Sequence, residues 1–140
     1  MIIEFSVVDT KDFTIEHLFD NPENLDLIAN FQATNGAAGL EYYLKNQSVD
    51  DEENNCSRTY LVKDALSAEL VAYFSLKTGL ITIQLDGEKF DSVPAIELAN
   101  FAINKKYKDT HPESQKLGFY TFKKFVLPIR SEEHTSELQS

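Results

Sequence analysis

The hydrophobic and polar positions at the start of the chain predict a strand followed by a short helix. Ile2–Val8 alternates loosely and is apolar enough for a first strand. Between Asp9 and Asp20, the apolar residues Ile15, Leu18 and Phe19 recur at positions i, i+3 and i+4, which is the spacing of one helix face. We therefore predict a short amphipathic helix in this second segment.

Two further apolar stripes predict helices up to residue 45. Asn21-Pro22 is typical of a helix start, and Asn35-Gly36 is typical of a helix end. The stripe between them consists of Leu25, Leu27, Ile28 and Phe31. Ala37–Lys45 then carries Leu40, Tyr43 and Leu44 at helical spacing. In all, we expect two or three helices between Thr14 and Lys45.

A polar and acidic stretch separates these helices from a group of strands. Asn46–Asn55 contains four acidic residues and almost nothing that could be buried. Such a composition is typical of a solvated loop. We predict a loop here rather than a metal site.

The middle of the chain has the pattern of antiparallel strands. Ser57–Lys63 and Glu69–Lys77 are rich in β-branched and aromatic residues, and the polar turn Asp64–Ala68 separates them. They should form a hairpin. Gly79–Leu85 extends or follows the second strand, and Asp86–Lys89 has the composition of a turn.

The last third predicts another strand and a helix. Pro94–Asn104 carries apolar residues on both faces, which indicates a mostly buried strand. Lys105–Ser114 is polar and should be a connection. In Leu117–Leu127, apolar residues and lysines fall on opposite faces at helical spacing. This pattern predicts a helix that ends at Pro128. The order of elements predicts an α/β (α+β) fold.

Composition narrows the class of protein. The chain has 140 residues, which suits one domain, and 42% of them are hydrophobic. No apolar stretch reaches the roughly 18 residues that cross a bilayer, and the N-terminus lacks the basic region of a signal peptide. We therefore expect a cytoplasmic protein that does not enter membranes. The formal net charge of −10 disfavours direct binding of nucleic acid, although backbone N–H groups can still hold a pyrophosphate.

Cysteine and histidine residues offer no obvious chemistry. Cys56 is the single cysteine and should be a structural residue at the edge of a strand. His17 and His111 have no metal-ligand spacing and no serine or cysteine placed for nucleophilic catalysis. We predict no metal site.

The end of the chain has an unusual origin. Arg130–Ser140 matches, codon by codon, the translation of a widely used sequencing-library adapter; the alternative is a genuine polar tail. We therefore expect residues 1–129 to be a partial domain whose natural sequence continues beyond Ile129, and we leave residues 130–140 out of the fold reasoning.

One motif resembles a known family. A strand, a polar loop and a helix that opens with Gln115-Lys116-Leu117-Gly118-Phe119-Tyr120 are similar to the phosphate loop of GCN5-related N-acetyltransferases (GNAT). The family pattern is Gln/Arg-x-x-Gly-x-Gly/Ala, so Gln115 and Gly118 match, whereas Tyr120 departs from it. Ala72–Leu76 followed by Val93–Ile103 also resembles the third and fourth strands of the toxin-like acetyltransferase subgroup.

The resemblance implies a fold and a cofactor. It implies a GNAT-like mixed, largely antiparallel sheet with helices on both faces, incomplete after the third helix. It also implies acetyl-coenzyme A (acetyl-CoA) as co-substrate. The backbone of Gln115, Lys116, Leu117, Gly118, Phe119 and Tyr120 would hold the pyrophosphate at the helix N-terminus. The backbone of Phe101, Ala102 and Ile103 would pair with the pantetheine amides like an added strand.

The resemblance also suggests catalytic groups. Glu97 is the acid of the fourth strand and the candidate general base; the alternative is that it points to solvent. The family's usual general acid, a tyrosine, would lie beyond Ile129. Tyr107 and Tyr120 are expected to be packing residues.

The leading functional hypothesis is an N-acetyltransferase that moves acetyl from acetyl-CoA to a primary amine, with the fragment itself inactive. The acceptor is unknown: protein, transfer RNA-linked amino acid, polyamine and antibiotic amines all stay open, as does a homodimer. The alternative is a non-catalytic coenzyme A-binding or protein-interaction domain, which Tyr120 favours. A third hypothesis is a generic α/β module whose motif match is accidental.

Overall fold

The computed structural model describes residues 13–84, 87, 90–111 and 121–126. The elements in chain order are β1 (Phe13–His17), η1 (Leu18–Asp20), α2 (Asn24–Ala29), α3 (Ala38–Asn46), α4 (Ser48–Glu53), β2 (Arg58–Asp64), β3 (Leu70–Gln84), β4 (Phe90–Ile103), α5 (Lys105–Thr110) and η2 (Phe122–Val126). The first predicted strand, Ile2–Val8, lies outside the described residues. Among the described residues, no helix is long and apolar enough to cross a membrane.

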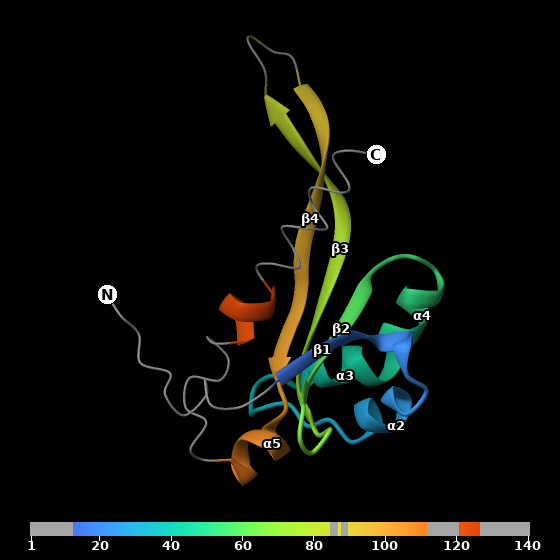
Figure 1. Cartoon of the computed structure of the whole chain (residues 1–140). Helices are drawn as coiled ribbons and strands as arrows, with labels where there is room; N and C mark the ends of the chain where they lie inside the picture. Colours follow the sequence, from blue (N-terminus) through green and yellow to red (C-terminus); the bar gives the residue numbers. More distant parts are fainter. Residues whose placement is uncertain (1–12, 85–86, 88–89, 112–120, 127–140) are drawn as a thin grey trace, which may run out of the picture.

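The four strands form one sheet in the order β1-β2-β3-β4, and every neighbouring pair is antiparallel. The predicted hairpin of β2 and β3 is confirmed. β3 also continues without a break through Gly79 to Gln84, and β4 pairs with it over that whole length. Figure 1 shows the result: the two long strands leave the body of the domain as a projecting two-stranded arm. At its tip, Gly87 adopts a φ of 76°, a value that favours glycine in a turn.

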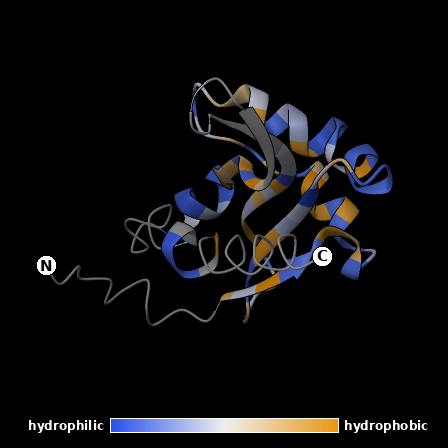
Figure 2. Cartoon of the chain, turned by 90° about the horizontal axis from the view of Figure 1, so that it is seen from above, coloured by the Kyte–Doolittle hydropathy of each residue, from blue (hydrophilic) through white to orange (hydrophobic). Residues whose placement is uncertain are grey.

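Each face of the sheet has its own hydrophobic core. Side chains alternate along β3, so Tyr73 faces the helices α2 to α4 while Ala72 and Phe74 face the opposite side. The core under α2 to α4 is built from Leu18, Ile28, Phe31, Ala33, Leu44, Leu61, Leu70, Tyr73 and Ala102. The opposite core, which α5 and η2 cover, is built from Phe13, Val62, Val71, Ala72, Phe74, Leu76, Ile96, Tyr107 and Val126. Figure 2 shows hydrophobic positions gathered where helices meet the sheet, with hydrophilic positions on the outer sides of the helices.

A buried asparagine fixes the end of β4. The Asn104 side-chain amide donates to the Leu70 carbonyl at 2.8 Å, and its oxygen accepts from the Gln32 N–H at 3.2 Å and the Lys106 N–H at 3.4 Å. The Asn104 N–H donates to the Val71 carbonyl at 2.8 Å. One side chain therefore joins the sheet, the loop after α2 and the N-terminus of α5.

The predicted helix between Asp9 and Asp20 is wrong in its described part. Residues 13–17 form the strand β1, and the helical part is reduced to the single turn η1. The apolar residues Phe13 and Ile15 alternate with Thr14 and Glu16, which suits a strand whose one face packs on a core. Pairing with β2 outweighs the helical spacing of the residues that follow.

The predicted acidic loop at Asn46–Asn55 is also wrong, because it contains α4. Asp50 and Asp51 occupy the first turn, where acids interact favourably with the helix dipole. Ser48 is buried and its hydroxyl donates to the Leu44 carbonyl at 2.5 Å. The acidic composition is thus that of a short amphipathic helix.

Three further predictions are corrected at residue level. The expected polar connection Lys105–Ser114 begins with the helix α5, which Asn104 caps and whose Tyr107 is buried. β4 begins earlier than predicted, and it is only partly buried: Ala95, Ile96 and Ala102 are buried, whereas Glu97 and Ala99 are exposed. Cys56 lies in the connection before β2 and is exposed. The predicted helices α2 and α3 are confirmed, and residues 121–126 of the predicted helix Leu117–Leu127 are helical.

Candidate functional site

Strand β4 carries the residues that sequence analysis proposed for chemistry. Glu97 lies opposite Lys77 on β3, and its Oε2 is 3.6 Å from the lysine Nζ. The two side chains are 55% and 51% exposed. Glu97 is thus accessible and placed beside a cation, and its role as a general base is a proposal taken up below.

The cofactor-binding segment of β4 lies further along the same strand. Phe101, Ala102 and Ile103 pair with β3 through Phe74, Tyr73 and Ala72 respectively. In an antiparallel strand, alternate residues direct their backbone N–H and C=O groups to opposite edges. No other described strand pairs with the far edge of β4, so this edge offers backbone groups to an extended ligand among the residues that the structure describes.

A β-bulge separates Glu97 from this segment. Ser75 pairs with Asn100, whereas Leu76 pairs with Leu98, so Ala99 is an extra residue on β4. A bulge leaves its extra residue outside the ladder and bends the strand, and bulges are frequent beside active sites. The backbone of Ala99 is therefore presented differently from that of its neighbours, between the candidate base and the candidate pantetheine segment.

The proposed phosphate loop lies outside the described residues. This applies to Gln115, Lys116, Leu117, Gly118, Phe119 and Tyr120. The described chain resumes at Thr121, which is buried, and η2 then packs Val126 into the core beneath β3 and β4. The loop's position relative to β4 stays a prediction.

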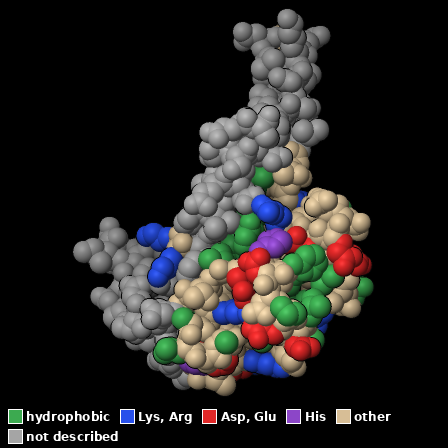
Figure 3. Space-filling model, turned by 45° about the vertical axis from the view of Figure 1, so that its right-hand side comes forward, with side chains coloured by type: hydrophobic (Ala, Val, Ile, Leu, Met, Phe, Trp, Pro, Cys, Tyr) green, Lys and Arg blue, Asp and Glu red, His purple; other side chains and the backbone are tan. Residues whose placement is uncertain are grey.

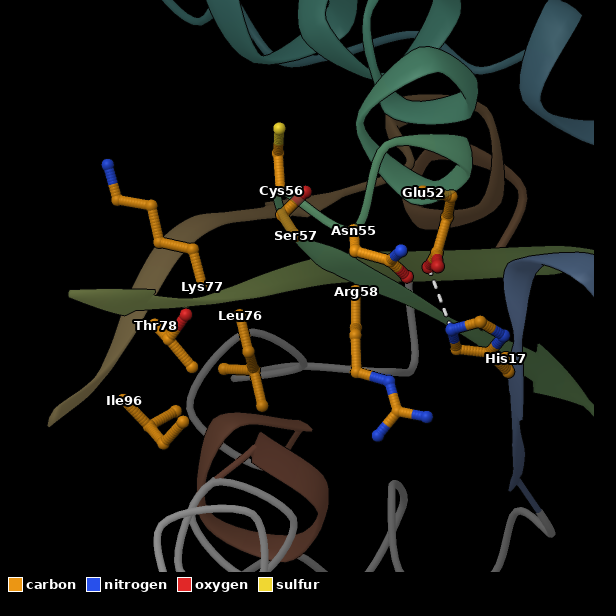
Figure 4. A pocket seen from close by; sticks show the side chains of 10 residues that line it. All are labelled: His17, Glu52, Asn55, Cys56, Ser57, Arg58, Leu76, Lys77, Thr78 and Ile96. Atoms are coloured by element: carbon orange, nitrogen blue, oxygen red, sulfur yellow. Dashed lines mark ion pairs between the residues drawn. The ribbon is translucent and has the colours of Figure 1, made fainter. Parts of the chain in front are cut away.

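A pocket of about 450 Å³ lies beside β3, next to the start of β2. Its walls come from the end of β1, the end of α4 with the connection to β2, the start of β2, and the parts of β3 and β4 that continue beyond β2 (Figure 4). The lining residues are His17, Glu52, Asn55, Cys56, Ser57, Arg58, Leu76, Lys77, Thr78 and Ile96. Polar groups from β1, α4, β2 and β3 therefore line the pocket together with the apolar side chains of Leu76 and Ile96.

A carboxylate–imidazole pair forms one wall of this pocket. Glu52 Oε1 lies 2.7 Å from His17 Nε2 and accepts the Thr59 N–H at 2.6 Å. β1 ends at His17, opposite Tyr60, so Thr59 is the first residue of β2 beyond the end of β1. The Glu52 carboxylate thus accepts the Thr59 N–H at a position where β1 no longer pairs with β2. This position also leaves the Glu52 side chain only 7% exposed.

A hydroxyl cluster lies beneath the same wall. The Tyr43 hydroxyl donates to Asp51 Oδ2 at 2.9 Å and lies 2.6 Å from Ser57 Oγ, while Thr59 Oγ1 and Ser75 Oγ are 3.0 Å apart. Burial, together with the Asp51 carboxylate, raises the pKa of Tyr43 above its ordinary value. These hydrogen bonds tie α3 and α4 to the connection before β2, and β2 to β3, beside the pocket.

Charge is distributed unevenly around the pocket. Figure 3 shows acidic side chains spread over this face of the molecule, with basic and histidine side chains adjoining below the arm. Of the charged side chains that line the pocket, Arg58 and Lys77 are basic and Glu52 is acidic. The described residues contain no group of three His, Cys, Asp or Glu side chains that could hold a metal ion.

Sequence analysis missed the pocket residues. His17 was given no role, and Glu52 lay in a segment predicted to be a loop. The pairing of β1 with β2 and the contact of α4 with the start of β2 bring them together, and no short-range spacing signals such a contact. Tyr107 is a packing residue, as predicted: it is buried, and its hydroxyl donates to Asp64 Oδ2 at 2.7 Å. The His111 ring stacks on the Tyr107 ring.

Comparisons with known proteins identify the fold. No protein-family model and no curated protein matches the chain. Among solved structures, AtaT complexed with acetyl-methionyl-tRNAfMet is 19% identical, with a TM-score of 0.53, over 79% of this chain and 67% of that chain. A tyrosine mutant of KacT is 17% identical, with a TM-score of 0.54, over 82% and 74%. AtaTR bound with AcCoA is 20% identical, with a TM-score of 0.54, over 76% and 64%.

These likenesses confirm the predicted fold class. The chain has a mixed α/β fold with an antiparallel sheet and helices on both faces, as in the AtaT and KacT structures. It spans about two thirds of the length of those chains. Identities of this size establish the fold, and the activity of this chain is argued separately.

Proposed function

We propose that this chain is part of an N-acetyltransferase that moves the acetyl group of acetyl-CoA to a primary amine. The observation that carries the proposal is the open edge of β4 with a bulge at Ala99, in the same fold as a structure solved with AcCoA. The phosphate-loop motif at Gln115 and Gly118 follows this strand in the sequence, as the proposed activity requires.

Backbone groups would do most of the cofactor binding. The pantetheine amides would pair with the far edge of Phe101–Ile103 in the manner of an added strand. The pyrophosphate would be held by the N–H groups from Gln115 to Tyr120, where Gly118 permits close approach. This explains how a chain with a net charge of −10 can bind an anionic cofactor.

The reaction would be direct attack on the thioester. The neutral amine nitrogen forms a bond to the carbonyl carbon, and the oxygen becomes an oxyanion. The C=O bond then re-forms as the C–S bond breaks, and the proton that the now cationic nitrogen loses balances the proton that the coenzyme A thiolate takes up to leave as the thiol. The ammonium proton must leave before attack, and Glu97 is the candidate acceptor for it. The extra residue of the bulge, Ala99, is not part of the regular ladder. We propose that its backbone N–H would stabilise the oxyanion.

The acceptor is proposed only as a primary amine. AtaT was solved with acetyl-methionyl-tRNAfMet, so a transfer RNA-linked amino acid belongs among the acceptors to be tested. The net charge of −10 weighs against broad contact with a nucleic acid backbone. Polyamine, protein and antibiotic amines therefore belong in the same assay.

A second candidate is a coenzyme A-binding or protein-interaction domain without catalysis. Two observations favour it: Tyr120 departs from the small residue of the motif, and Glu97 is an exposed acid paired with Lys77. The two proposals agree on cofactor binding and differ in turnover.

Calorimetric titration with acetyl-CoA tests what both proposals share. Gly118→Glu should abolish binding because it places a negative charge where the phosphates lie. The matched control is Gly39→Glu, since a Cβ atom added at Gly39 in α3 would meet nothing outside its own stretch of helix within 4 Å. Absence of acetyl-CoA binding by the unmodified chain, or equal binding by both variants, would refute the site.

Release of free thiol separates catalysis from binding. With acetyl-CoA and an amine acceptor, turnover supports the transferase, and Glu97→Gln should then slow transfer more than it weakens binding. Since we expect the fragment itself to be inactive, the assay also uses the natural protein, in which the source gene's own sequence replaces residues 130–140. Binding of acetyl-CoA by that protein without thiol release, for every acceptor class, favours the non-catalytic domain.

A further inference from the structure

The connection between α4 and β2 leaves a gap beside β3. β2 begins at Arg58, and β3 continues beyond that point. In the register of these two strands, the partner of Thr78 would be residue 56. Instead, the N–H groups of Cys56 and Ser57 donate to the Asp51 carbonyl in α4, at 2.8 and 3.4 Å. The pocket lies at this gap, and both Cys56 and Thr78 line it.

The backbone of Thr78 faces this gap. The Thr59 N–H donates to Glu52 on the β1 side of β2, at 2.6 Å, so the backbone of Thr59 faces away from β3. Because antiparallel strands alternate, the next residue, Arg58, faces β3 and exchanges hydrogen bonds with Leu76. Two residues further along β3, the N–H and C=O groups of Thr78 face the same side, where no described strand pairs with them.

This edge of β3 suits an added strand. From Thr78 to Gln84, the strand contains no charged residue and no proline, which are the residues that usually protect an edge from pairing. The alternation continues along β3, so the backbone of Leu80 faces the open side as that of Thr78 does. An extended peptide can therefore pair with these two residues by main-chain hydrogen bonds.

Charge determines the direction of the added strand. An antiparallel neighbour on this side runs in the same direction as β2, so its C-terminal end meets the start of β2. Two basic side chains, Arg58 and Lys77, line the pocket there, on opposite sides of β3 (Figure 4). The one acid of the lining, Glu52, is only 7% exposed and is held by His17 and the Thr59 N–H. A free carboxylate is thus favoured at this end, whereas the ammonium group of a parallel peptide would be repelled.

We propose that this pocket binds the C-terminal segment of a partner protein as an added strand on β3. The last residue of the peptide lies opposite Thr78, and its carboxylate binds Arg58 and Lys77. The Lys77 ammonium group is 3.6 Å from Glu97, and it has further N–H donors for a second carboxylate. The site is separate from the far edge of β4 that is proposed for acetyl-CoA, so either proposal can fail alone.

An NMR titration of the full chain, labelled with nitrogen-15, tests the site. The probe is an acetylated Val-Thr-Val tripeptide with a free carboxylate, because β-branched residues favour an extended backbone. The amide signals of Thr78 and Leu80 should shift to saturation, and that of Gly79, which faces β4, should shift less. The same tripeptide with a C-terminal amide should bind about tenfold more weakly, because it lacks charge-assisted hydrogen bonds.

Three variants locate the contacts. Thr78→Pro removes the N–H that faces the gap and keeps the ladder to β4, so it should weaken binding of the acid about fivefold. The matched control is Thr82→Pro, which removes an N–H of the same edge beyond the reach of a tripeptide and should leave the affinity unchanged. Arg58→Gln should bring the affinities for the acid and the amide close together.

Several results would overturn the proposal. They are the absence of a saturable shift with the acid, equal affinity for acid and amide, equal loss in Thr78→Pro and Thr82→Pro, and an undiminished preference for the acid in Arg58→Gln. Occupation of the edge by a second copy would also do so, and it would move the same signals with protein concentration in the absence of peptide. The spectrum of each variant shows whether it folds, and Arg58→Gln changes only an exposed side chain, so the test stands even if the proline variants unfold.

Discussion

Asn104 is expected to be among the most sensitive polar residues of the described structure. Replacement by alanine removes the donor to the Leu70 carbonyl and the acceptor for the N–H groups of Gln32 and Lys106. The carbonyl of Leu70 is left unsatisfied in a buried place, which costs about 1–3 kcal/mol, and loss of the helix cap adds about 1 kcal/mol. We expect a total destabilisation of about 3 kcal/mol.

Urea unfolding followed by circular dichroism measures this loss. The matched control is Asn46→Ala, because the Asn46 side chain is exposed and donates only to the carbonyl one turn earlier in α3. It should change the free energy of unfolding by less than about 0.5 kcal/mol. A second variant, Asn104→Asp, keeps the acceptor for the cap but sets a buried carboxylate oxygen against the Leu70 carbonyl, so at neutral pH it should destabilise at least as much as Asn104→Ala. If Asn104→Ala unfolds at the same urea concentration as Asn46→Ala, the reasoning fails.

Three further outcomes follow from buried polar groups. Tyr107→Phe should lose about 2 kcal/mol, since its hydroxyl donates to the buried carboxylate at the end of β2, whereas the exposed Tyr42→Phe should lose almost nothing in the same urea assay. Glu52→Ala should lose about 2 kcal/mol because a strand N–H loses its acceptor, and exposed Glu53→Ala serves as its control. Burial raises the pKa of Tyr73, so the folded protein favours its neutral form. The contribution of this group to the free energy of unfolding is therefore complete below the unfolded pKa of about 10 and declines at higher pH. Tyr73→Phe should therefore show less alkaline destabilisation than the unmodified chain, and an equal decline would contradict the prediction.

The sheet was predictable from the sequence where its signals are local. Residues 57–77 have β-branched and aromatic runs on both sides of a polar turn, and they form the hairpin as predicted. The helices α2 and α3 have apolar stripes with start and stop residues, and both are found. In these segments, the local preference and the tertiary contacts agree.

The failures share a physical cause. β1 was predicted as helix because the apolar residues after it fall at helical spacing, and only its partner strand, far away in sequence, decides the matter. α4 was predicted as loop because its acids seemed to have nothing to contact. In the structure, Asp51 meets Tyr43 and Glu52 meets both a strand N–H and His17. Composition alone does not reveal partners that the fold supplies.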